Sequence, residues 1–124
     1  MKFRIIILCL IVAAFSFGCK KAISVKCDDK IKDASPKAAI GSSFSIACPS
    51  GCGNGSVWGT DTYTTDSSLC AAAVHAGAIE AAKGGTAVVT VTKSLPSYKG
   101  SARNGVKTRD WGTSWGDSAF KVSK

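Results

Sequence analysis

The chain has 124 residues, of which 45% are hydrophobic, and a formal net charge of +8 from 16 basic and 8 acidic side chains. This length suits about one domain, and the hydrophobic fraction excludes a disordered chain. The excess of positive charge favours anionic partners such as phosphate groups, acidic glycans or anionic lipids.

Residues 1–18 have the pattern of a secretory signal peptide, because Lys2 and Arg4 precede an apolar run that ends shortly before Cys19. The run is too short to span a bilayer, since a spanning helix needs about 20 residues. The junction resembles that of a bacterial lipoprotein, in which the cysteine at the cleavage site carries the lipid. We therefore expect an exported protein held to the membrane only by a lipid on Cys19. Ordinary cleavage that leaves Cys19 free is the alternative.

Cysteine usage supports export. Of the six cysteines, Cys9 leaves with the signal and Cys19 lies at the cut, so four remain for the folded part: Cys27, Cys48, Cys52 and Cys70. An even number of cysteines in an exported chain predicts two disulfides. A zinc site of four thiolates is disfavoured because paired C-x2-C motifs are missing and the compartment is oxidising. We expect no metal and no cofactor.

The first half of the mature chain contains two segments with strand patterns. Residues 19–26 form a short basic stretch without periodicity, for which we expect a tether with no fixed structure, and residues 28–42 indicate a loop. Residues 43–48 alternate apolar and polar side chains, which predicts a half-buried strand. After a turn rich in glycine, β-branched and aromatic residues predict a strand that begins at Val57 and runs towards Tyr63.

The next segment predicts a buried helix. Apolar and small residues from Leu69 to Gly77 form two stripes that leave almost no polar face, which is typical of a helix packed on several sides. Asp66 or Ser67 is expected to cap its N-terminus. We expect the helix to leave the core near Glu80 and to end at the glycine pair 84–85.

The remaining sequence predicts two strands separated by a long loop. Residues 86–92 alternate with one apolar face, and residues 118–122 form the last strand. Between them, Asn104 and Gly105 mark a turn. The chain is therefore predicted to be an α+β protein with a central apolar helix, without internal repeats or a second domain.

Several of these motifs, in this order and spacing, resemble those of an LCCL domain. They are "CPSGC" at 48–52, "VWGTDTY" at 57–63, "SSLCAAAVHAGAI" at 67–79, "GG" at 84–85, "RNGV" at 103–106, and a closing tryptophan and phenylalanine at 115 and 120. The resemblance extends over residues 27–122, nearly the whole mature chain. It implies a central helix wrapped by β-sheets.

The resemblance also implies a disulfide pairing and a class of function. Family members pair the first cysteine with the second and the third with the fourth, here Cys27 with Cys48 and Cys52 with Cys70. Each bridge is expected to stabilise the fold by roughly 3 kcal/mol. LCCL domains occur in secreted animal proteins, including an endotoxin-sensing clotting protease, and are regarded as non-catalytic. Binding of lipopolysaccharide or another ligand has been proposed for them.

Candidate catalytic residues are few, and each has a structural interpretation. His75 is the only histidine, so a metal site lacks further ligands, and no motif supplies a third group to orient it as a base. We interpret it as a buried histidine whose ring nitrogens bond to backbone or water. Asp61 and Asp66 flank Tyr63, and turn and helix-cap roles account for both. The sequence does not predict an enzyme.

The strongest candidate binding site is the loop after residue 92, where cations alternate with aromatic residues. Residues 93–109 contain no acidic side chain, and without Lys2 and Arg4 the chain keeps 14 basic against 8 acidic residues, a net charge of +6. Cations beside aromatic rings suit phosphorylated sugars or anionic lipid heads. The alternative is a solvated basic loop whose tryptophans turn into the core. The predicted ligand-binding residues are Lys93, Tyr98, Lys99, Arg103, Lys107, Arg109 and Trp111.

These observations predict a non-catalytic binding module in the periplasm, at the outer membrane or on the cell surface. Its expected partner is an anionic glycolipid or glycan such as lipopolysaccharide. The alternative is a structural or protein-interaction module of the cell envelope, with an envelope protein as its partner. Nucleic acid is not expected as a partner of an exported protein.

Overall fold

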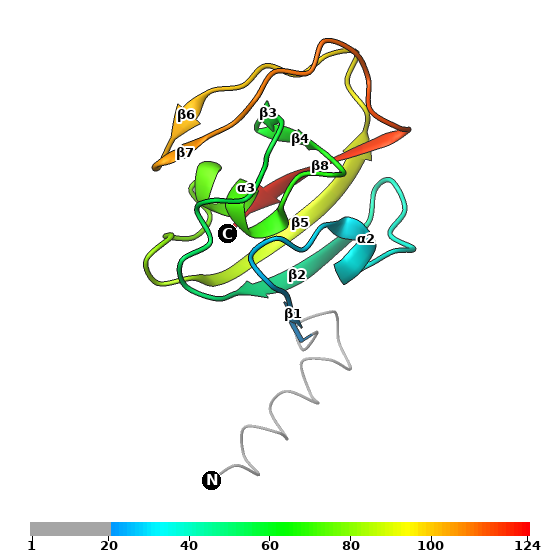
Figure 1. Cartoon of the computed structure of the whole chain (residues 1–124). Helices are drawn as coiled ribbons and strands as arrows, with labels where there is room; N and C mark the ends of the chain where they lie inside the picture. Colours follow the sequence, from blue (N-terminus) through cyan, green and yellow to red (C-terminus); the bar gives the residue numbers. More distant parts are fainter. Residues whose placement is uncertain (1–20) are drawn as a thin grey trace, which may run out of the picture.

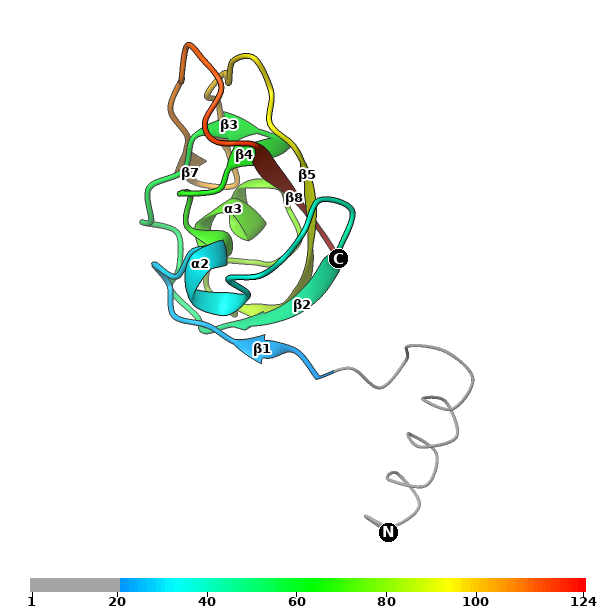
Figure 2. The same cartoon turned by 90° about the vertical axis from the view of Figure 1, so that its right-hand side faces the viewer.

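The computed structural model describes residues 21–124, in which one curved sheet of six strands partly encloses a central helix, α3 (Figures 1 and 2). The strand order is β1-β2-β5-β8-β4-β3, and β6 and β7 form a separate hairpin. The architecture is the predicted α+β fold with a helix wrapped by β-structure. The predicted signal peptide and the lipid site at Cys19 lie outside the described residues.

The centre of the sheet consists of three antiparallel strands at the positions that the sequence predicted: β2 (Ser43–Cys48), β5 (Gly85–Lys93) and β8 (Ser118–Ser123). Ile46 lies opposite Ala87, and Val91 lies opposite Phe120. These four side chains are buried, whereas their neighbours along each strand are more exposed, apart from Ala119. One face of the sheet therefore builds the core against α3.

The N-terminal residues of the described chain are more ordered than expected. Strand β1 (Ile23–Ser24) pairs in parallel with β2, and Val25 is buried at 8% exposure. The expectation of a tether without fixed structure up to residue 26 is therefore wrong for residues 23–25. Residues 28–42 also contain a short helix, α2 (Ile31–Ala34), which buries Ile31.

Two short strands replace the single strand expected between Val57 and Tyr63. Strands β3 (Gly59–Thr60) and β4 (Thr62–Thr64) form a hairpin whose turn residue Asp61 has a φ of 66°. Aspartate tolerates this left-handed conformation better than most residues. Strand β4 then pairs with β8, which joins the hairpin to the main sheet.

Helix α3 (Leu69–His75) is completely enclosed, because each of its seven residues is at most 1% exposed. Its N-terminal cap is Ser68, one residue beyond the predicted candidates, and its hydroxyl oxygen accepts a hydrogen bond from the Ala71 amide at 3.2 Å. Ser67 instead accepts a bond from the Trp58 amide at 3.0 Å. The prediction of a buried helix is therefore confirmed, and the predicted cap is wrong.

The helix ends earlier than expected. Gly77 has a φ of 82°, and the Ala78 amide donates to the Ala73 carbonyl oxygen while the Gly77 amide donates to that of Val74. These two bonds form a Schellman motif, which satisfies carbonyl groups that the helix end would otherwise leave free. The predicted end at 84–85 is therefore wrong, since those glycines close a later turn that starts at Glu80.

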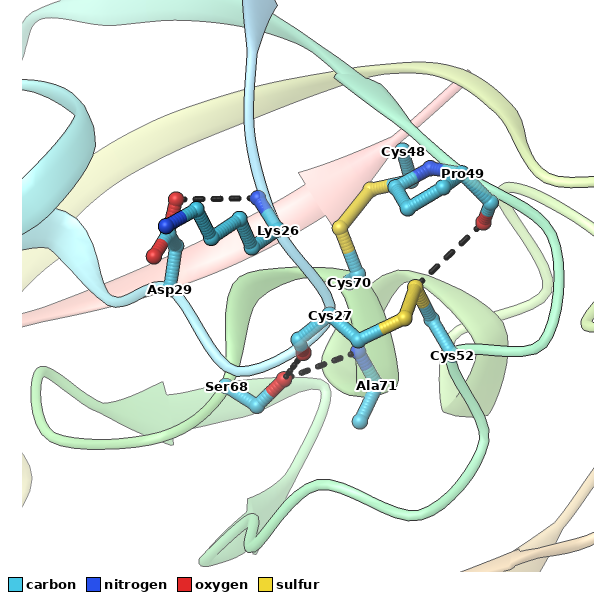
Figure 3. The surroundings of a disulfide bond; sticks show 9 residues. All are labelled: Lys26, Cys27, Asp29, Cys48, Pro49, Cys52, Ser68, Cys70 and Ala71. Atoms are coloured by element: carbon cyan, nitrogen blue, oxygen red, sulfur yellow. Dashed lines mark hydrogen bonds between the residues drawn. A yellow bond between two sulfur atoms is a disulfide. The ribbon is translucent and has the colours of Figure 1, made fainter.

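The two disulfides join Cys27 to Cys52 and Cys48 to Cys70, with Cα–Cα distances of 4.8 and 5.8 Å (Figure 3). The pairing implied by the resemblance is therefore wrong. The alternation of β2 turns Cys48 towards α3, where Cys70 lies in the first helical turn. Cys27 instead lies over the N-terminus of α3, where its carbonyl oxygen accepts a bond from the Ser68 hydroxyl.

The loop between β5 and β8 contains the hairpin of β6 (Ala102–Arg103) and β7 (Val106–Lys107). Its two turn residues, Asn104 and Gly105, have φ values of 53° and 80°, as a two-residue hairpin turn requires. Val106 is buried, and β7 contacts α3. Within residues 21–124, no helix is both long and apolar enough to cross a membrane.

Candidate functional site

The structure separates the seven predicted binding residues into several places. Five are cations with exposed side chains, and Trp111 is 38% exposed. Lys93 ends β5, Lys99 precedes the β6–β7 hairpin, and Arg103 and Lys107 lie on it. Arg103 is cross-strand to buried Val106, whereas Lys107 is cross-strand to exposed Ala102. The two hairpin cations therefore belong to opposite faces of the hairpin.

Arg103 is neutralised by a residue far away in the sequence. Its Nη1 atom lies 2.7 Å from Oδ1 of Asp61, the turn residue between β3 and β4. Both side chains are substantially exposed, at 45% and 66%, so the pair adds little stability. The pair nevertheless neutralises Arg103, so this residue does not add to the unpaired positive charge of the loop.

Tyr98 is buried at 4% exposure, so its ring does not form part of an open surface. Its hydroxyl accepts a hydrogen bond from the Leu95 amide at 3.0 Å and contacts the Ser94 hydroxyl, also at 3.0 Å. Its backbone bonds to Trp111 in both directions, at 2.7 and 2.9 Å. Tyr98 therefore holds the long loop together and is unsuited to direct ligand contact.

Lys107 and Arg109 share one shallow hollow. It has a volume of about 320 Å³ and is also lined by residues 100–102, Thr108 and Asp110. The Arg109 guanidinium carbon lies 5.8 Å from the centre of the Trp58 ring, within the range of a cation–π contact. Arg109 thus connects the basic loop with an aromatic residue that precedes β3.

The alternative interpretation of the loop requires its tryptophans to turn into the core, and they do not. Trp111 and Trp115 are each 38% exposed, and their rings meet edge to face with centroids 5.6 Å apart and planes at 84°. Together with Trp58, Thr64 and Asp66 they line a second pocket. The sequence indicated only Trp111 as a ligand residue, because nothing along the chain shows that residues 58, 66 and 115 come together.

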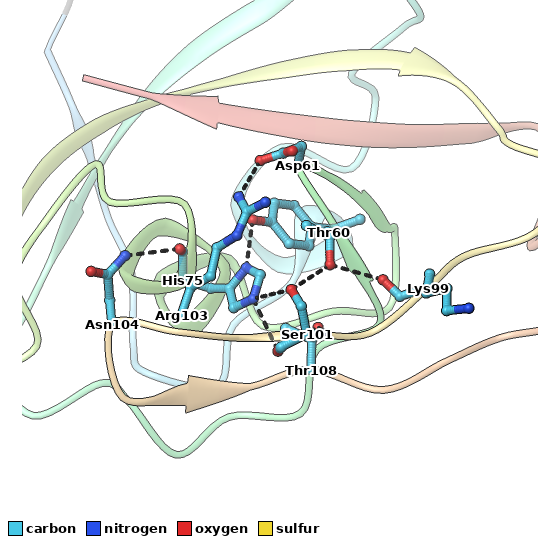
Figure 4. A network of polar contacts seen from close by, with 9 residues as sticks. Thr60, Asp61, His75, Lys99, Ser101, Arg103, Asn104 and Thr108 are labelled. Carbon is cyan, nitrogen blue, oxygen red and sulfur yellow. Dashed lines mark hydrogen bonds and ion pairs between the residues drawn. The ribbon is translucent and has the colours of Figure 1, made fainter.

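His75 lies at the centre of a buried hydrogen-bond network that ties the hairpin loop to α3 (Figure 4). Its Nε2 atom lies 3.2 Å from the Ser101 carbonyl oxygen and 3.1 Å from the Ser101 hydroxyl. Its Nδ1 atom lies 2.9 Å from the Tyr63 hydroxyl. Its own carbonyl oxygen accepts a bond from the Asn104 side chain at 3.0 Å.

These partners define the protonation state of the ring. A carbonyl oxygen can only accept a hydrogen bond, so Nε2 carries the proton and donates it, and Nδ1 accepts from Tyr63. Burial lowers the pKa of His75 below its usual 6.5, which favours the same neutral ring. Burial also raises the pKa of Tyr63 to about 12. Both groups are therefore uncharged near neutral pH.

The network has the spacing of a serine nucleophile and its base but the opposite hydrogen-bond direction. A catalytic base must accept the serine proton, whereas Nε2 of His75 donates towards Ser101. The Thr60 hydroxyl donates its hydrogen bond to the Lys99 carbonyl oxygen. The Ser101 hydroxyl is therefore the donor in its own contact with Thr60, at 2.6 Å. This is the geometry of a structural histidine. Among residues 21–124, no group of three or more histidine, cysteine or acidic residues could hold a metal ion.

Residues 25–118 match the family model of the LCCL domain. The chain belongs to the LCCL domain family. LCCL domains are binding modules that are not typically catalytic, in agreement with the structural role of His75. The resemblance seen in the sequence is thereby confirmed.

Three relatives illustrate the setting of the domain. Human cysteine-rich secretory protein LCCL domain-containing 2 is 38% identical over 82 residues, which are 62% of this chain and 16% of that protein. Human vitrin is 42% identical over 67 residues, 52% of the chain and 10% of vitrin. Clotting factor C of Tachypleus tridentatus is 38% identical over 88 residues, 69% of the chain and 8% of the factor.

The chain spans less than a fifth of the length of each of these relatives. One of these relatives is named as a secretory protein, and this chain carries two disulfides, which form in an oxidising compartment. Both observations support an exported protein.

Proposed function

We propose that this LCCL domain binds an anionic component of the cell envelope, such as lipopolysaccharide or an acidic glycan. The observation that carries the proposal is the set of exposed cations in a segment without an acidic residue: Lys93, Lys99, Lys107 and Arg109. Within residues 21–124, only Arg103 among the cations of this segment has an ion pair. The other four are free to meet anionic groups.

We also propose that the domain is lipid-anchored through Cys19, in the periplasm, at the outer membrane or at the cell surface. Only residues 20–22 separate Cys19 from β1, so the four residue steps from Cys19 to Ile23 can span at most about 14 Å. A domain so close to its anchor meets membrane glycolipids at short range, where salt screens charge attraction least. Mass spectrometry of the protein from intact cells is expected to show a lipid that Cys19→Ser abolishes.

The binding proposal is tested with residues 20–124, purified with both disulfides formed, and purified lipopolysaccharide at about 50 mM and about 300 mM salt. Binding is expected to weaken as salt rises. The variant with Lys99→Ala, Lys107→Ala and Arg109→Ala is expected to lose about a hundredfold in affinity, at about 1 kcal/mol for each cation near an anionic surface.

The matched control removes three exposed lysines elsewhere, with Lys37→Ala, Lys121→Ala and Lys124→Ala, and has the same net charge. It is expected to bind within about threefold of the wild type. An equal loss in both variants would show that net charge, rather than this loop, attracts the ligand, and would contradict the proposal. A folded protein that binds no lipopolysaccharide or acidic glycan would point to a protein partner.

A further inference from the structure

All three tryptophans of the chain line one pocket of about 240 Å³, although residue 58 is far from residues 111 and 115 in the sequence. None of the three belongs to the hydrophobic core cluster around α3, and two of them are 38% exposed. Core packing therefore does not account for their position. Aromatic side chains gathered in a partly open pocket are typical of a ligand-binding site.

Backbone hydrogen bonds from both segments hold the pocket in shape. The Trp58 amide donates to Ser67 beside the start of α3, and the Trp58 carbonyl oxygen accepts from the Thr64 amide at 3.2 Å. Trp111 pairs with buried Tyr98 in both directions. The rings of Trp111 and Trp115 are nearly perpendicular, so they form two walls rather than one flat face. The pocket is therefore largely preformed, which lowers the entropic cost of binding.

A carboxylate provides the polar part of the pocket. Oδ1 of Asp66 accepts a hydrogen bond from the Thr64 hydroxyl at 2.5 Å, and Thr64 is itself 1% exposed. Oδ2 of Asp66 makes no hydrogen bond to any of residues 21–124, which leaves it free to accept bonds from a ligand. An indole surface beside such an acceptor suits a sugar ring, because a sugar has an apolar C–H face and hydroxyl groups at its edge.

Cations adjoin the pocket on two sides. A neighbouring hollow of about 350 Å³ shares Asp66 and Trp115 with the pocket and is lined by Lys30, the N-cap of α2, and by Lys32 within α2. On the side of Trp58, the Arg109 guanidinium lies over the indole ring. Acidic groups on sugars that flank the bound ring would meet positive charge in both directions.

A quaternary ammonium group is the competing occupant, since aromatic cages with a carboxylate bind such cations. The neighbouring charges disfavour it. Arg109 already contacts Trp58, and Lys30 and Lys32 line the adjoining hollow, so a further cation would meet like charge from both sides.

We propose that Trp58, Trp111, Trp115 and Asp66 bind one sugar ring of an acidic oligosaccharide, whose flanking acidic groups contact Arg109 on one side and Lys30 and Lys32 on the other. The inference rests on the proposed function and deepens it by naming the residues that recognise the glycan itself. The volume supports a single ring, because pockets for drug-sized ligands have roughly 300–1,000 Å³.

Tryptophan fluorescence tests this directly, because every tryptophan lies in the pocket. The full chain is produced in a host that exports it and is purified with both disulfides formed. It is then titrated with the phosphorylated core oligosaccharide of deacylated lipopolysaccharide. Isothermal calorimetry records total binding in parallel. We expect a saturable shift of the emission spectrum, and about a tenfold weaker affinity for Trp115→Ala and for Asp66→Asn.

Leu95→Ala is the matched control, because Leu95 is also 38% exposed and lies outside the pocket. It is expected to bind as the wild type does, and thermal unfolding confirms that the variants are folded. Calorimetric binding without an emission shift, equal in Trp115→Ala and wild type, would overturn the inference and leave the proposed function standing. Absence of oligosaccharide binding in calorimetry would overturn the inference alone if intact lipopolysaccharide still binds, and would overturn the proposed function as well if lipopolysaccharide and acidic glycans do not bind. An emission shift with choline but not with the oligosaccharide would assign the pocket to a quaternary ammonium group.

Discussion

Helix α3 and the loop segment 94–117 are in contact, yet their residues are buried to very different degrees. Every residue of α3 is buried, whereas only Tyr98, Val106 and Thr108 are buried in the segment. The helix is built from small and apolar residues and one neutral histidine, and the segment from glycines, cations and tryptophans. The buried helix and its disulfides therefore stabilise the fold, whereas the exposed loop is the surface that we propose for ligand binding.

The two regions are joined by a few specific contacts. Val106 packs into the core, and the His75 network fixes the hairpin loop through Ser101 and Asn104. Buried polar groups of this kind are costly to leave unpaired. These contacts, which we call the junction, hold the loop against α3 and leave its outer surface exposed. Substitutions in the helix should therefore change stability, whereas substitutions on the loop surface should change ligand binding.

The largest effect is expected from loss of a disulfide on the helix side. Replacing Cys48 and Cys70 together with alanine should lower the free energy of unfolding by about 3 kcal/mol, since the bridge closes a sequence separation of 22 residues. Urea unfolding followed by circular dichroism measures the loss. Peptide mapping of the non-reduced wild type should recover Cys27 joined to Cys52, and a peptide joining Cys27 to Cys48 would contradict the pairing.

A smaller loss is expected at the junction. His75→Leu leaves the buried Tyr63 hydroxyl without its acceptor and should lower the free energy of unfolding by about 2 kcal/mol. Adding Tyr63→Phe removes the unpaired hydroxyl, so the double variant should be more stable than the sum of the single losses implies. Additive losses in urea unfolding would show that the two side chains are not coupled.

The junction should also determine how stability depends on pH. The pKa of His75 is lowered in the folded state, so the unfolded chain binds a proton first, and stability should fall as pH drops below about 6.5. The pKa of Tyr63 is raised to about 12, so stability should fall again as pH rises above about 10. Melting temperatures across this range measure both limbs. The part of the acid limb that His75 causes should vanish in His75→Leu.

The smallest effect on stability is expected on the loop side. The variant with Lys99→Ala, Lys107→Ala and Arg109→Ala changes only exposed side chains, so its free energy of unfolding should stay within about 0.5 kcal/mol of the wild type. A loss of unfolding free energy as large as that of His75→Leu would show that the loop cations stabilise the fold. The separation of stability in the helix from ligand binding in the loop would then be wrong.

Local patterns predicted the elements that are decided locally. The alternation of residues 43–48 and 86–92 predicted two central strands, and the apolar composition of α3 predicted its burial. The helix end was missed because both Gly77 and the pair 84–85 can stop a helix, and only the hydrogen bonds of Ala73 and Val74 decide between them. The disulfide pairing was wrong because the path of β1 along β2 is a tertiary feature.

The candidate site was only partly predictable for the same reason. Exposed cations between residues 93 and 109 follow from composition. The neutralisation of Arg103 by Asp61 and the gathering of Trp58 with Trp111 and Trp115 depend on how the β3–β4 hairpin lies against the long loop. The burial of Tyr98 was not predicted, because the position of an aromatic residue between cations in the sequence does not show whether its ring faces solvent or the interior.

The interleaved order of the two disulfides has a consequence for biogenesis. A chain that crosses a membrane from its N-terminus presents Cys27 and Cys48 to the oxidising side before Cys52 and Cys70 emerge. The first pair available for oxidation is then one that the folded protein does not contain. The native pairs are therefore favoured when oxidation waits until α3 has crossed, or when the first bond is exchanged by thiol attack, the reaction that disulfide isomerases catalyse.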